Sequence, residues 1–363
     1  MNMTVLVNKL PGETRVALLQ DGQAIAFYSS KETASGPPVG TILLGKVIRI
    51  AKELSAAFVD LGHDTLGFLP IKKAHVLTEG ASIMVQVKVP AIQKEGKGPR
   101  LSQEIRLLSP LLILLPRESS VSFSKHFSDM EQKEALKSHF SGKCGLIFRR
   151  TAQGVSLTDL QKSYDNLETT WQSLEKIAAN SKTPKVIYSP PPMPLRFFQY
   201  YSGPSFKRVL VDDSEIFNDL KRNNVSFVEI FKPERGDSSD LFEAFDVEKD
   251  WESLSHNTIE IPGGGSLIIE ETSALTAIDV NSDGERDLVA FNKSAAKEIA
   301  RQLRLRNVSG PILIDFAGQK TPAMIKKVME ILKGEIASDP ISTHFFGRTP
   351  LGLVEIVRER RSF

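Results

Sequence analysis

Short runs of apolar residues, separated by turn residues, open the chain and predict β-strands. The first runs cover residues 4–10, 15–19 and 24–28, and Asp21-Gly22 between the last two is a typical hairpin turn. The composition then changes at Gly36-Pro-Pro-Val-Gly40, which indicates a linker.

The linker is followed by closely spaced runs in which apolar and polar positions alternate. Gly62 and Gly67 interrupt them, and the spacing is typical of a small five-stranded barrel of about 75 residues. The expected strands cover residues 42–50, 55–61, 65–69, 83–89 and 101–105.

The pattern becomes mixed from Ser119 onwards. Ser189-Pro-Pro-Pro-Met-Pro194 marks a boundary that neither a helix nor a central strand can cross, and Pro262-Gly-Gly-Gly-Ser266 opens a last unit. The expected helices cover residues 129–139, 160–179 and 214–222, and the expected strands cover residues 145–148, 208–211 and 227–231.

The composition is that of a globular protein. Apolar residues make up 41% of the 363 residues and charged residues 25%, which excludes disordered, collagen-like and coiled-coil classes. With 46 Lys and Arg against 44 Asp and Glu, the net charge of +2 neither supports nor opposes a polyanionic partner. Cys144 is the single cysteine, so an internal disulfide and a Cys-rich zinc site are excluded.

No segment resembles a signal peptide or a membrane span. The N-terminus lacks a basic start followed by an apolar stretch. The most apolar run, residues 107–115, is interrupted by Ser109 and Pro110 and is far shorter than the roughly 20 residues that cross a bilayer. We therefore expect a soluble, cytoplasmic protein with no membrane partner.

Two apolar strands of the last unit each end near an aspartate. Asp279 lies near the end of residues 275–281, and Asp315 has the same place in residues 311–316. A helix expected over residues 287–306 connects them, so the strands can be parallel neighbours joined by a right-handed crossover. The carboxylates then meet at the C-terminal ends of the strands, where open α/β sheets bind ligands.

Asn281 adds an amide to this pair, because it lies two residues after Asp279 on the same face of the strand. Two carboxylates and an amide oxygen form a hard-oxygen site suited to Mg²⁺ or Mn²⁺. An equally open alternative is that each aspartate only caps the next helix or satisfies a loop. A calcium loop starting at Asp279 is excluded, because its last ligand position holds Ala290 and a strand precedes it.

The predicted barrel carries aromatic residues on its polar face. Alternation in residues 55–61 separates Phe58 from the apolar face, and Phe68 is a second candidate for stacking nucleic-acid bases. Lys97 and Arg100 lie in a predicted loop that could contact phosphates. The alternative is that both phenylalanines fill a seam with a neighbouring domain.

The helix expected over residues 287–306 is amphipathic. Its basic side chains recur at helical spacing and either track phosphates or form a solvated charged face, which is the commoner meaning of such a stripe. They are Lys293, Lys297, Arg301 and Arg304.

Several motifs together resemble the ribonuclease E/G family of bacterial endoribonucleases. Gly264-Gly-Ser-Leu-Ile-Ile-Glu-Glu-Thr-Ser-Ala-Leu-Thr-Ala-Ile-Asp-Val-Asn-Ser282 looks like the family's catalytic signature, and Ile312-Leu-Ile-Asp-Phe316 continues it. Ala56-Ala-Phe-Val-Asp-Leu-Gly62 and Gly67-Phe-Leu-Pro70 resemble its OB-fold RNA-binding domain. Gly145-Leu-Ile-Phe-Arg-Arg-Thr-Ala152 is similar to its 5′-phosphate sensor.

The resemblance spans nearly the whole chain and implies an α+β multidomain fold. Residues 1–38 and 196–262 would form a ribonuclease-H-like subdomain, and residues 39–118 an OB-fold RNA-binding domain. Residues 119–195 would form the 5′-sensor region, and residues 263–363 a deoxyribonuclease-I-like α/β catalytic subdomain that binds the metal.

The resemblance also implies a catalytic role for three matched side chains. Asp279 and Asp315 would hold Mg²⁺, or Mn²⁺ in its place, and Asn281 would support the metal or the scissile phosphate.

Further matched residues would bind the substrate. Phe58, Phe68 and Lys97 would hold single-stranded RNA across the barrel, and Arg150 and Thr151 would bind a 5′-monophosphate by charge-assisted hydrogen bonds.

The chain departs from the family pattern in several places. It stops at Phe363 without the usual Cys-x-x-Cys zinc link between protomers, so we expect no structural zinc and a monomer or a dimer formed without zinc. The loop at 282–291 is shorter than usual, no second acid follows Asp315-Phe316, and Pro350 in the stretch 347–355 replaces a usual arginine. These changes are expected to alter RNA affinity and substrate choice.

The sequence therefore predicts a Mg²⁺-dependent endoribonuclease that cuts single-stranded RNA to 5′-phosphate and 3′-hydroxyl ends, in rRNA maturation or mRNA turnover. The competing hypothesis is an RNA-binding factor of the same fold with weak or no nuclease activity. Retention of Asp279, Asn281 and Asp315 favours the enzyme, whereas the shortened loop and the missing zinc link favour the binding factor.

Overall fold

A computed structural model of the protein describes residues 2–30, 36–62, 66–71, 77–91, 98–124, 127–201, 206–233, 240–272, 274–284, 287–318, 321–337, 339 and 341–359. Helices and strands are mixed along the chain, which confirms the α+β class. The chain divides into two compact units. The first consists of Met1–Ser30, Phe206–Lys221 and Ser226–Arg361, and the second of Lys31–Ser205, Arg222–Val225 and Ser362–Phe363.

The first sheet of the first unit pairs strands that come before the long segment Lys31–Ser205 of the second unit with strands that come after it. Its strand order is β15-β14-β1-β2-β3, and β1 runs parallel to β14. At the predicted hairpin turn Asp21 and Gly22 both have positive φ, 50° and 88°, as a type I′ turn requires. The strands are β1 (Met3–Leu10), β2 (Glu13–Gln20), β3 (Gln23–Ser29), β14 (Arg208–Val211) and β15 (Val228–Ile230), and the helices beside them are α4 (Ser214–Arg222), α5 (Leu241–Ala244) and α6 (Glu248–Ser253).

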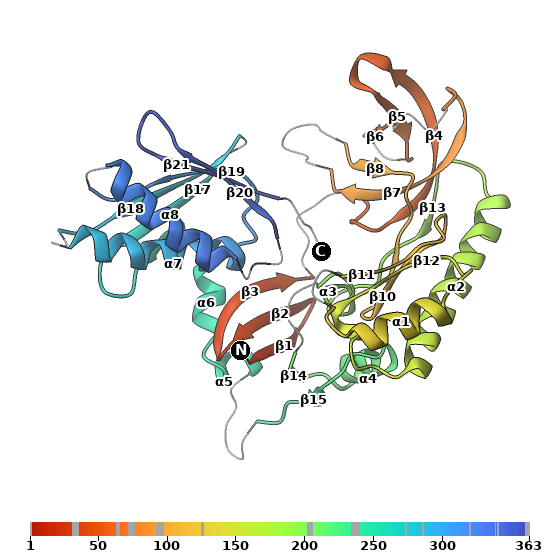
Figure 1. Ribbon diagram of the computed structural model, residues 1–363, viewed down its shortest axis with the longest axis horizontal. Coiled ribbons are helices and arrows are strands. Elements are labelled where there is room, and N and C mark those ends of the chain that lie inside the picture. Colours follow the sequence, from red (N-terminus) through yellow and green to blue (C-terminus); the bar gives the residue numbers. More distant parts are fainter. Residues whose placement is uncertain are drawn as a thin grey trace. The chain divides into compact units, whose positions relative to one another are not determined.

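The second sheet of this unit has the order β16-β17-β18-β19-β21-β20, with α7 and α8 along one face (Figure 1). The core between the sheet and these helices is built from aliphatic side chains of both layers. The elements are β16 (Thr258–Glu260), β17 (Ser266–Glu271), β18 (Thr276–Asn281), α7 (Leu288–Leu305), β19 (Gly310–Asp315), α8 (Pro322–Ile336), β20 (Thr343–Arg348) and β21 (Val354–Arg358).

Helix α7 links the two sheets of the first unit. Asp287 caps its N-terminus by accepting hydrogen bonds from the backbone N–H groups of Val289 and Ala290. The apolar stripe through Ile299 is buried against the second sheet, and Leu305 belongs to the core of the first. The helix is therefore clamped on both sides, which fixes the connection between β18 and β19.

The second unit contains the predicted barrel. Strands follow the order β13-β4-β5-β6-β8-β7, and an additional pairing of β4 with β7 closes five of them into an OB-like barrel. All five predicted strands are present, although the last is shorter than expected. They are β4 (Ile42–Ala51), β5 (Ala56–Asp60), β6 (Gly67–Pro70), β7 (Ser82–Val89) and β8 (Arg100–Ser102), and β13 (Lys185–Tyr188), which the sequence pattern did not indicate, adds to β4.

A smaller sheet of order β11-β12-β10-β9 completes the second unit. It shares an apolar core with the long helix α2, in which Tyr164 and Trp171 are buried. The elements are β9 (Leu107–Leu108), β10 (Leu112–Leu115), β11 (Val121–Phe123), α1 (Met130–His139), β12 (Gly145–Phe148), α2 (Leu157–Ala179) and α3 (Leu195–Tyr200).

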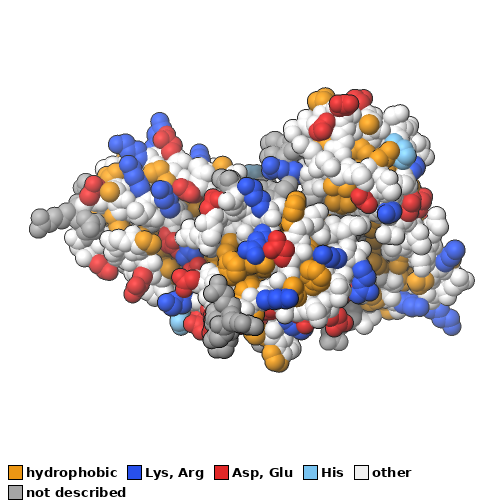
Figure 2. Space-filling model, turned by 90° about the horizontal axis from the view of Figure 1, so that it is seen from below, with side chains coloured by type: hydrophobic (Ala, Val, Ile, Leu, Met, Phe, Trp, Pro, Cys, Tyr) orange, Lys and Arg blue, Asp and Glu red, His pale blue; other side chains and the backbone are white. Residues whose placement is uncertain are grey.

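None of the helices in the described part of the chain is long and apolar enough to cross a bilayer. Acidic and basic side chains are interspersed over the face shown in Figure 2, in keeping with the small net charge of +2.

Candidate metal centre and nucleic-acid surface

Asp279 and Asp315 are direct register partners on adjacent strands. Strands β18 and β19 run parallel, and the pairing ends at Asp279 opposite Asp315. The parallel pairing predicted from the strand–helix–strand spacing is therefore confirmed. Both carboxylates lie at the C-terminal end of their strands, because α7 carries the chain back along the sheet between them.

The two carboxylates lie on the face of the sheet opposite the helices. Ile278 and Ile314, each one residue before an aspartate, are buried in the core under α7 and α8. Since neighbouring side chains on a strand point to opposite faces, Asp279 and Asp315 face away from that core. Asp279 is exposed and Asp315 is half-buried with its Oδ1 enclosed, so the pair is open to solvent mainly through Asp279.

Asn281 is hydrogen-bonded to one member of the pair, Asp279. Its Nδ2 donates to Oδ2 of Asp279 at 3.1 Å, which orients both side chains on the open face. The nearby Gly265 has a φ of +75°, and a Cβ there would lie 2.4 Å from the carbonyl oxygen of Asn281. Glycine at this position lets β17 approach the end of β18 closely.

The loop after β19 is held by a side chain that the sequence analysis did not single out. Asn292 on α7 is fully buried; its Nδ2 donates to the carbonyl of Ala317 at 2.9 Å and its Oδ1 accepts from the N–H of Ala317 at 3.1 Å. Ala317 lies two residues after Asp315, so Asn292 fixes the backbone that carries this carboxylate. The sequence signal that could have identified Asn292 is that it is a polar residue within the apolar stripe of α7.

The donor set of this site fits a divalent cation such as Mg²⁺. Two carboxylates meet in register, and the amide can contribute only its oxygen, because its nitrogen carries the donor hydrogens. Nowhere in the described ranges do three or more His, Cys, Asp or Glu side chains gather in a way that could hold a metal ion. A cation would therefore keep several water or phosphate ligands, as Mg²⁺ commonly does.

A cross-strand row of side chains lies on the outer face of the barrel. Register pairs Arg49 of β4 with Phe58 of β5, Phe58 with Phe68 of β6, and Phe68 with Arg100 of β8. The two rings are 6.0 Å apart between centroids in an edge-to-face arrangement, and the guanidinium of Arg49 lies 4.9 Å from the centroid of Phe58. This row, Arg49-Phe58-Phe68-Arg100, is called the aromatic row below.

The aromatic row faces solvent rather than the barrel core. Ala57, Val59 and Leu69, which flank the two phenylalanines in sequence, are buried inside the barrel, so the predicted alternation is confirmed. Phe58 and Phe68 are half-buried. Arg100 was predicted in a loop but begins β8, and Lys97 lies outside the described residues.

The residues at 149–151 have three different environments. Arg149 is buried, and its guanidinium donates to the carbonyls of Ser109, Phe198, Gln199 and Tyr201; burial lowers its pKa to about 10. Arg150 is exposed, and no ion pair involves it within the described part of the chain. Thr151 is half-buried and its hydroxyl donates to the carbonyl of Pro110.

These contacts divide the roles available to the three side chains. Arg149 is a structural clamp between β12 and the end of α3. Arg150 presents a positive charge to solvent. Thr151 could donate to a phosphate only by giving up its bond to Pro110, so the structure brings the two predicted residues together but leaves only Arg150 ready to bind an anion.

Part of the basic stripe on α7 has a structural use. Arg301 forms ion pairs with Asp250 at 3.1 Å and with Glu298 at 3.0 Å, and Arg304 donates to the carbonyl of Glu335. These two side chains join α7 to α6 and α8 and do not track phosphates. Lys293 and Lys297 are exposed, as a solvated face requires.

Comparison with known proteins places these features in a family. The model of the Ribonuclease E/G family matches residues 107–361. The chain is 29% identical over 395 residues to Ribonuclease G of Haemophilus influenzae, covering 98% of this chain and 79% of that protein. It is 29% identical over 399 residues to Ribonuclease G of Escherichia coli (strain K12), covering 99% and 80%. It is 32% identical over 387 residues to Ribonuclease E of the same strain, covering 96% of this chain and 36% of that protein.

Proposed function

This chain belongs to the ribonuclease E/G family, and from its geometry we propose that it is an endoribonuclease that cuts single-stranded RNA at a divalent-metal site on β18 and β19. The single observation that carries the proposal is the register pairing of Asp279 with Asp315 on an open sheet face. An isolated aspartate at a strand end has many structural uses, whereas two in register at one edge repel each other and are stabilised by a shared cation.

Asp279 and Asp315 hold Mg²⁺ or Mn²⁺, and Asn281 orients Asp279 through its hydrogen bond. A bound Mg²⁺ supplies activation of water and neutralises charge on the scissile phosphate. The protein's part is to hold the two carboxylates in fixed register and to keep the loop after Asp315 in place through Asn292. Hydrolysis in line with the leaving 3′-oxygen gives 5′-phosphate and 3′-hydroxyl ends.

The barrel and the sensor region supply substrate binding. Phe58 and Phe68 stack bases of single-stranded RNA, with Lys97 as a further contact, because half-buried rings on an outer barrel face accept any base. Arg150 binds a 5′-monophosphate through its charge, and the hydroxyl of Thr151 joins it by giving up its hydrogen bond to Pro110. The β1–β3 sheet with β14 and β15 is assigned to the ribonuclease-H-like subdomain, and the sheet bearing Asp279 to the deoxyribonuclease-I-like catalytic subdomain.

The setting follows from the same assignment. The protein acts in the cytoplasm in rRNA maturation or mRNA turnover. A binding factor of the same fold would share the aromatic row and would not need the aspartate pair, so the experiment has to separate binding from cutting.

The decisive test uses the full chain and an A/U-rich single-stranded RNA with a 5′-monophosphate. Cleavage is followed with Mg²⁺ and with EDTA, for the wild type and for the double variant Asp279→Asn/Asp315→Asn. Asp246→Asn, an exposed turn residue of the same unit, is the matched control. We expect Mg²⁺-dependent cutting that the double variant loses and the control keeps, with RNA binding retained in all three.

Metal binding itself provides a readout independent of activity. Mg²⁺ should raise the unfolding temperature of the wild type and not that of the double variant, because a ligand of the native state stabilises it. Tight RNA binding without cutting, with no Mg²⁺ effect on unfolding, would exclude the nuclease and support the RNA-binding factor.

A further inference from the structure

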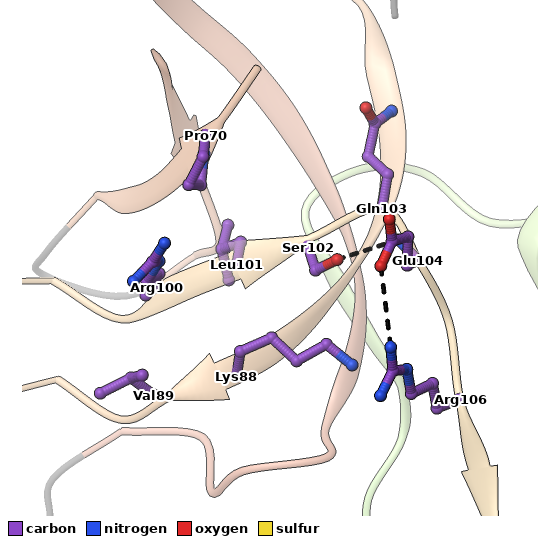
Figure 3. A pocket seen from close by; sticks show the side chains of 9 residues that line it. All are labelled: Pro70, Lys88, Val89, Arg100, Leu101, Ser102, Gln103, Glu104 and Arg106. Carbon is purple, nitrogen blue, oxygen red and sulfur yellow. Dashed lines mark hydrogen bonds and ion pairs between the residues drawn. The ribbon is translucent and has the colours of Figure 1, made fainter. Parts of the chain in front are cut away.

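A cavity of about 330 Å³ opens on the outer face of the barrel between β7 and β8. Figure 3 shows its lining side chains, which come from the end of β6, from β7 and β8, and from the segment after β8. The charged ones are Lys88, Arg100, Arg106 and Glu104. Three cations and one carboxylate give the cavity a net positive charge, although the whole chain is almost neutral.

A buried glutamine organises two of these cations. Gln86 is almost fully buried; its Oε1 accepts from the ammonium of Lys88 at 2.8 Å and from the backbone N–H of Arg106 at 3.0 Å. Its Nε2 donates to the carbonyls of Gly40 and Arg106 at 3.1 and 2.8 Å. Gln86 therefore fixes the ammonium of Lys88 next to the backbone of Arg106, whose guanidinium extends into the half-exposed cavity lining.

Among the residues that line the cavity, one carboxylate accompanies three cations. Glu104 lies 3.9 Å from Arg106 in a half-exposed ion pair, and its own backbone N–H donates to Ser102. Burial and the positive charge of Arg106 lower the pKa of Lys88 to about 8, against the opposing effect of Glu104. One carboxylate beside three cations leaves room for a bound anion, which would stabilise both Lys88 and Arg106 in their charged forms.

The cavity is continuous with the aromatic row. Arg100 both lines the cavity and is the register partner of Phe68. Strand β8 is thus bordered by a stacking ring on one side and by Lys88 of β7 on the other. A nucleotide strand whose bases stack on Phe58 and Phe68 and which continues across β8 would carry its next phosphates over this cavity.

We propose that the cavity between β7 and β8 binds a backbone phosphate of the single-stranded RNA, through Lys88, Arg100 and Arg106, next to the bases stacked on the aromatic row. This inference rests on the proposed function, since it extends the RNA path already assigned to the barrel. The guanidinium groups and the ammonium donate to phosphate oxygens, while Gln86 holds the ammonium of Lys88 and the backbone of Arg106 in place.

The test measures how each variant changes the binding of a short and of a long RNA. Binding of fluorescein-labelled oligouridylates of about four and about ten nucleotides, which span the site sizes of one OB fold, is measured in EDTA with the full chain. Variants are Lys88→Gln, Arg100→Gln and Arg106→Gln. Lys176→Gln, an exposed residue of α2, is the matched control, and Lys88→Arg keeps the charge.

We expect each glutamine variant to weaken binding of the long RNA about tenfold and to reduce its salt dependence by about one phosphate contact, a slope change of about 0.7. The short RNA, the Lys176 control and Lys88→Arg should stay close to wild type. Far-ultraviolet circular dichroism and the unfolding midpoint of each variant show that the barrel is intact.

Failure of this inference is distinguishable from failure of the proposed function. If the wild type binds and cuts RNA but the cavity variants keep its affinity and salt slope for the long RNA, the phosphate site is wrong and the nuclease stands. If inorganic phosphate binds in the cavity but the variants keep the RNA affinity of the wild type, the assignment of the cavity to RNA is likewise overturned. If the wild type binds no RNA, both proposals fall.

Discussion

Asn292 holds both backbone groups of Ala317, two residues beyond Asp315. Replacing Asn292 with alanine leaves the half-buried N–H and carbonyl of Ala317 without this partner, so the free energy of unfolding should fall by about 1–3 kcal/mol. Cleavage should fall as well, because the carboxylate of Asp315 loses its fixed backbone.

Urea unfolding and cleavage kinetics check this prediction. Asn180→Ala, at the exposed end of α2, is the control and should change both measurements little. Unchanged cleavage in a destabilised Asn292→Ala protein would show that the residue supports the fold but does not position the site.

The aromatic row predicts loss of RNA affinity when its rings are removed. Phe58→Leu and Phe68→Leu should each weaken binding of single-stranded RNA by about 1–3 kcal/mol per lost stacking contact. Phe68→Trp should keep the affinity, because it keeps a flat ring. Phe227, which is 61% exposed and lies outside the barrel, provides the control variant Phe227→Leu. Equal RNA affinities for all these variants would mean that the two rings serve only to pack against a neighbouring domain.

The environment of Lys88 predicts a pH dependence of RNA binding. With a pKa lowered to about 8 by burial and by Arg106, and raised in part by Glu104, Lys88 loses its proton as the pH rises through 8. A phosphate needs the charged form, so affinity for the long RNA should fall about tenfold from pH about 7 to about 9.

Lys88→Arg should flatten this profile, because a guanidinium stays protonated over the whole range. Fluorescence anisotropy at constant ionic strength makes the comparison. A profile that is equally steep in Lys88→Arg would assign the pH dependence to another group.

A buried ion pair predicts a large stability effect far from the proposed chemistry. Arg358 of β21 donates to Asp339 at 2.9 Å, and both side chains are 2% exposed. Asp339→Ala leaves a buried guanidinium charge and should lower the free energy of unfolding by about 3–5 kcal/mol. The double variant Asp339→Ala/Arg358→Met should recover part of this loss.

The exposed pair of Arg208 and Glu229 is the matched comparison, since its side chains are 49% and 52% exposed. Glu229→Ala should cost no more than about 1 kcal/mol. Similar losses for the two pairs in urea unfolding would contradict the importance of burial.

Much of the local structure was predictable from the sequence. The expected strand 208–211 and helix 214–222 coincide with β14 and α4, and the five barrel strands were all expected. Side-chain alternation, helical spacing and capping act over a few residues, so they can be read locally. For the same reason Asp279 and Asp315 could be placed at strand ends and Phe58 on the outer barrel face.

Apart from the parallel pairing of β18 with β19, pairings between distant segments were not predictable in this way. The order β16-β17-β18-β19-β21-β20, and the addition of β13 to β4, depend on which strands meet in space. The different uses of Arg149 and Arg150 also depend on which carbonyls surround them, since adjacent arginines have the same sequence signal.

The sequence by itself therefore determined the residue types at the strand ends and on the barrel surface, and with them the class of chemistry. Only the tertiary structure decided that Asp279 stands opposite Asp315, that Arg301 and Arg304 serve as clamps, and that Gln86 gathers Lys88 and Arg106 beside the aromatic row. The physical reason is that local patterns set which face a side chain takes, whereas its neighbours on that face come from strand register and packing between segments far apart in the chain.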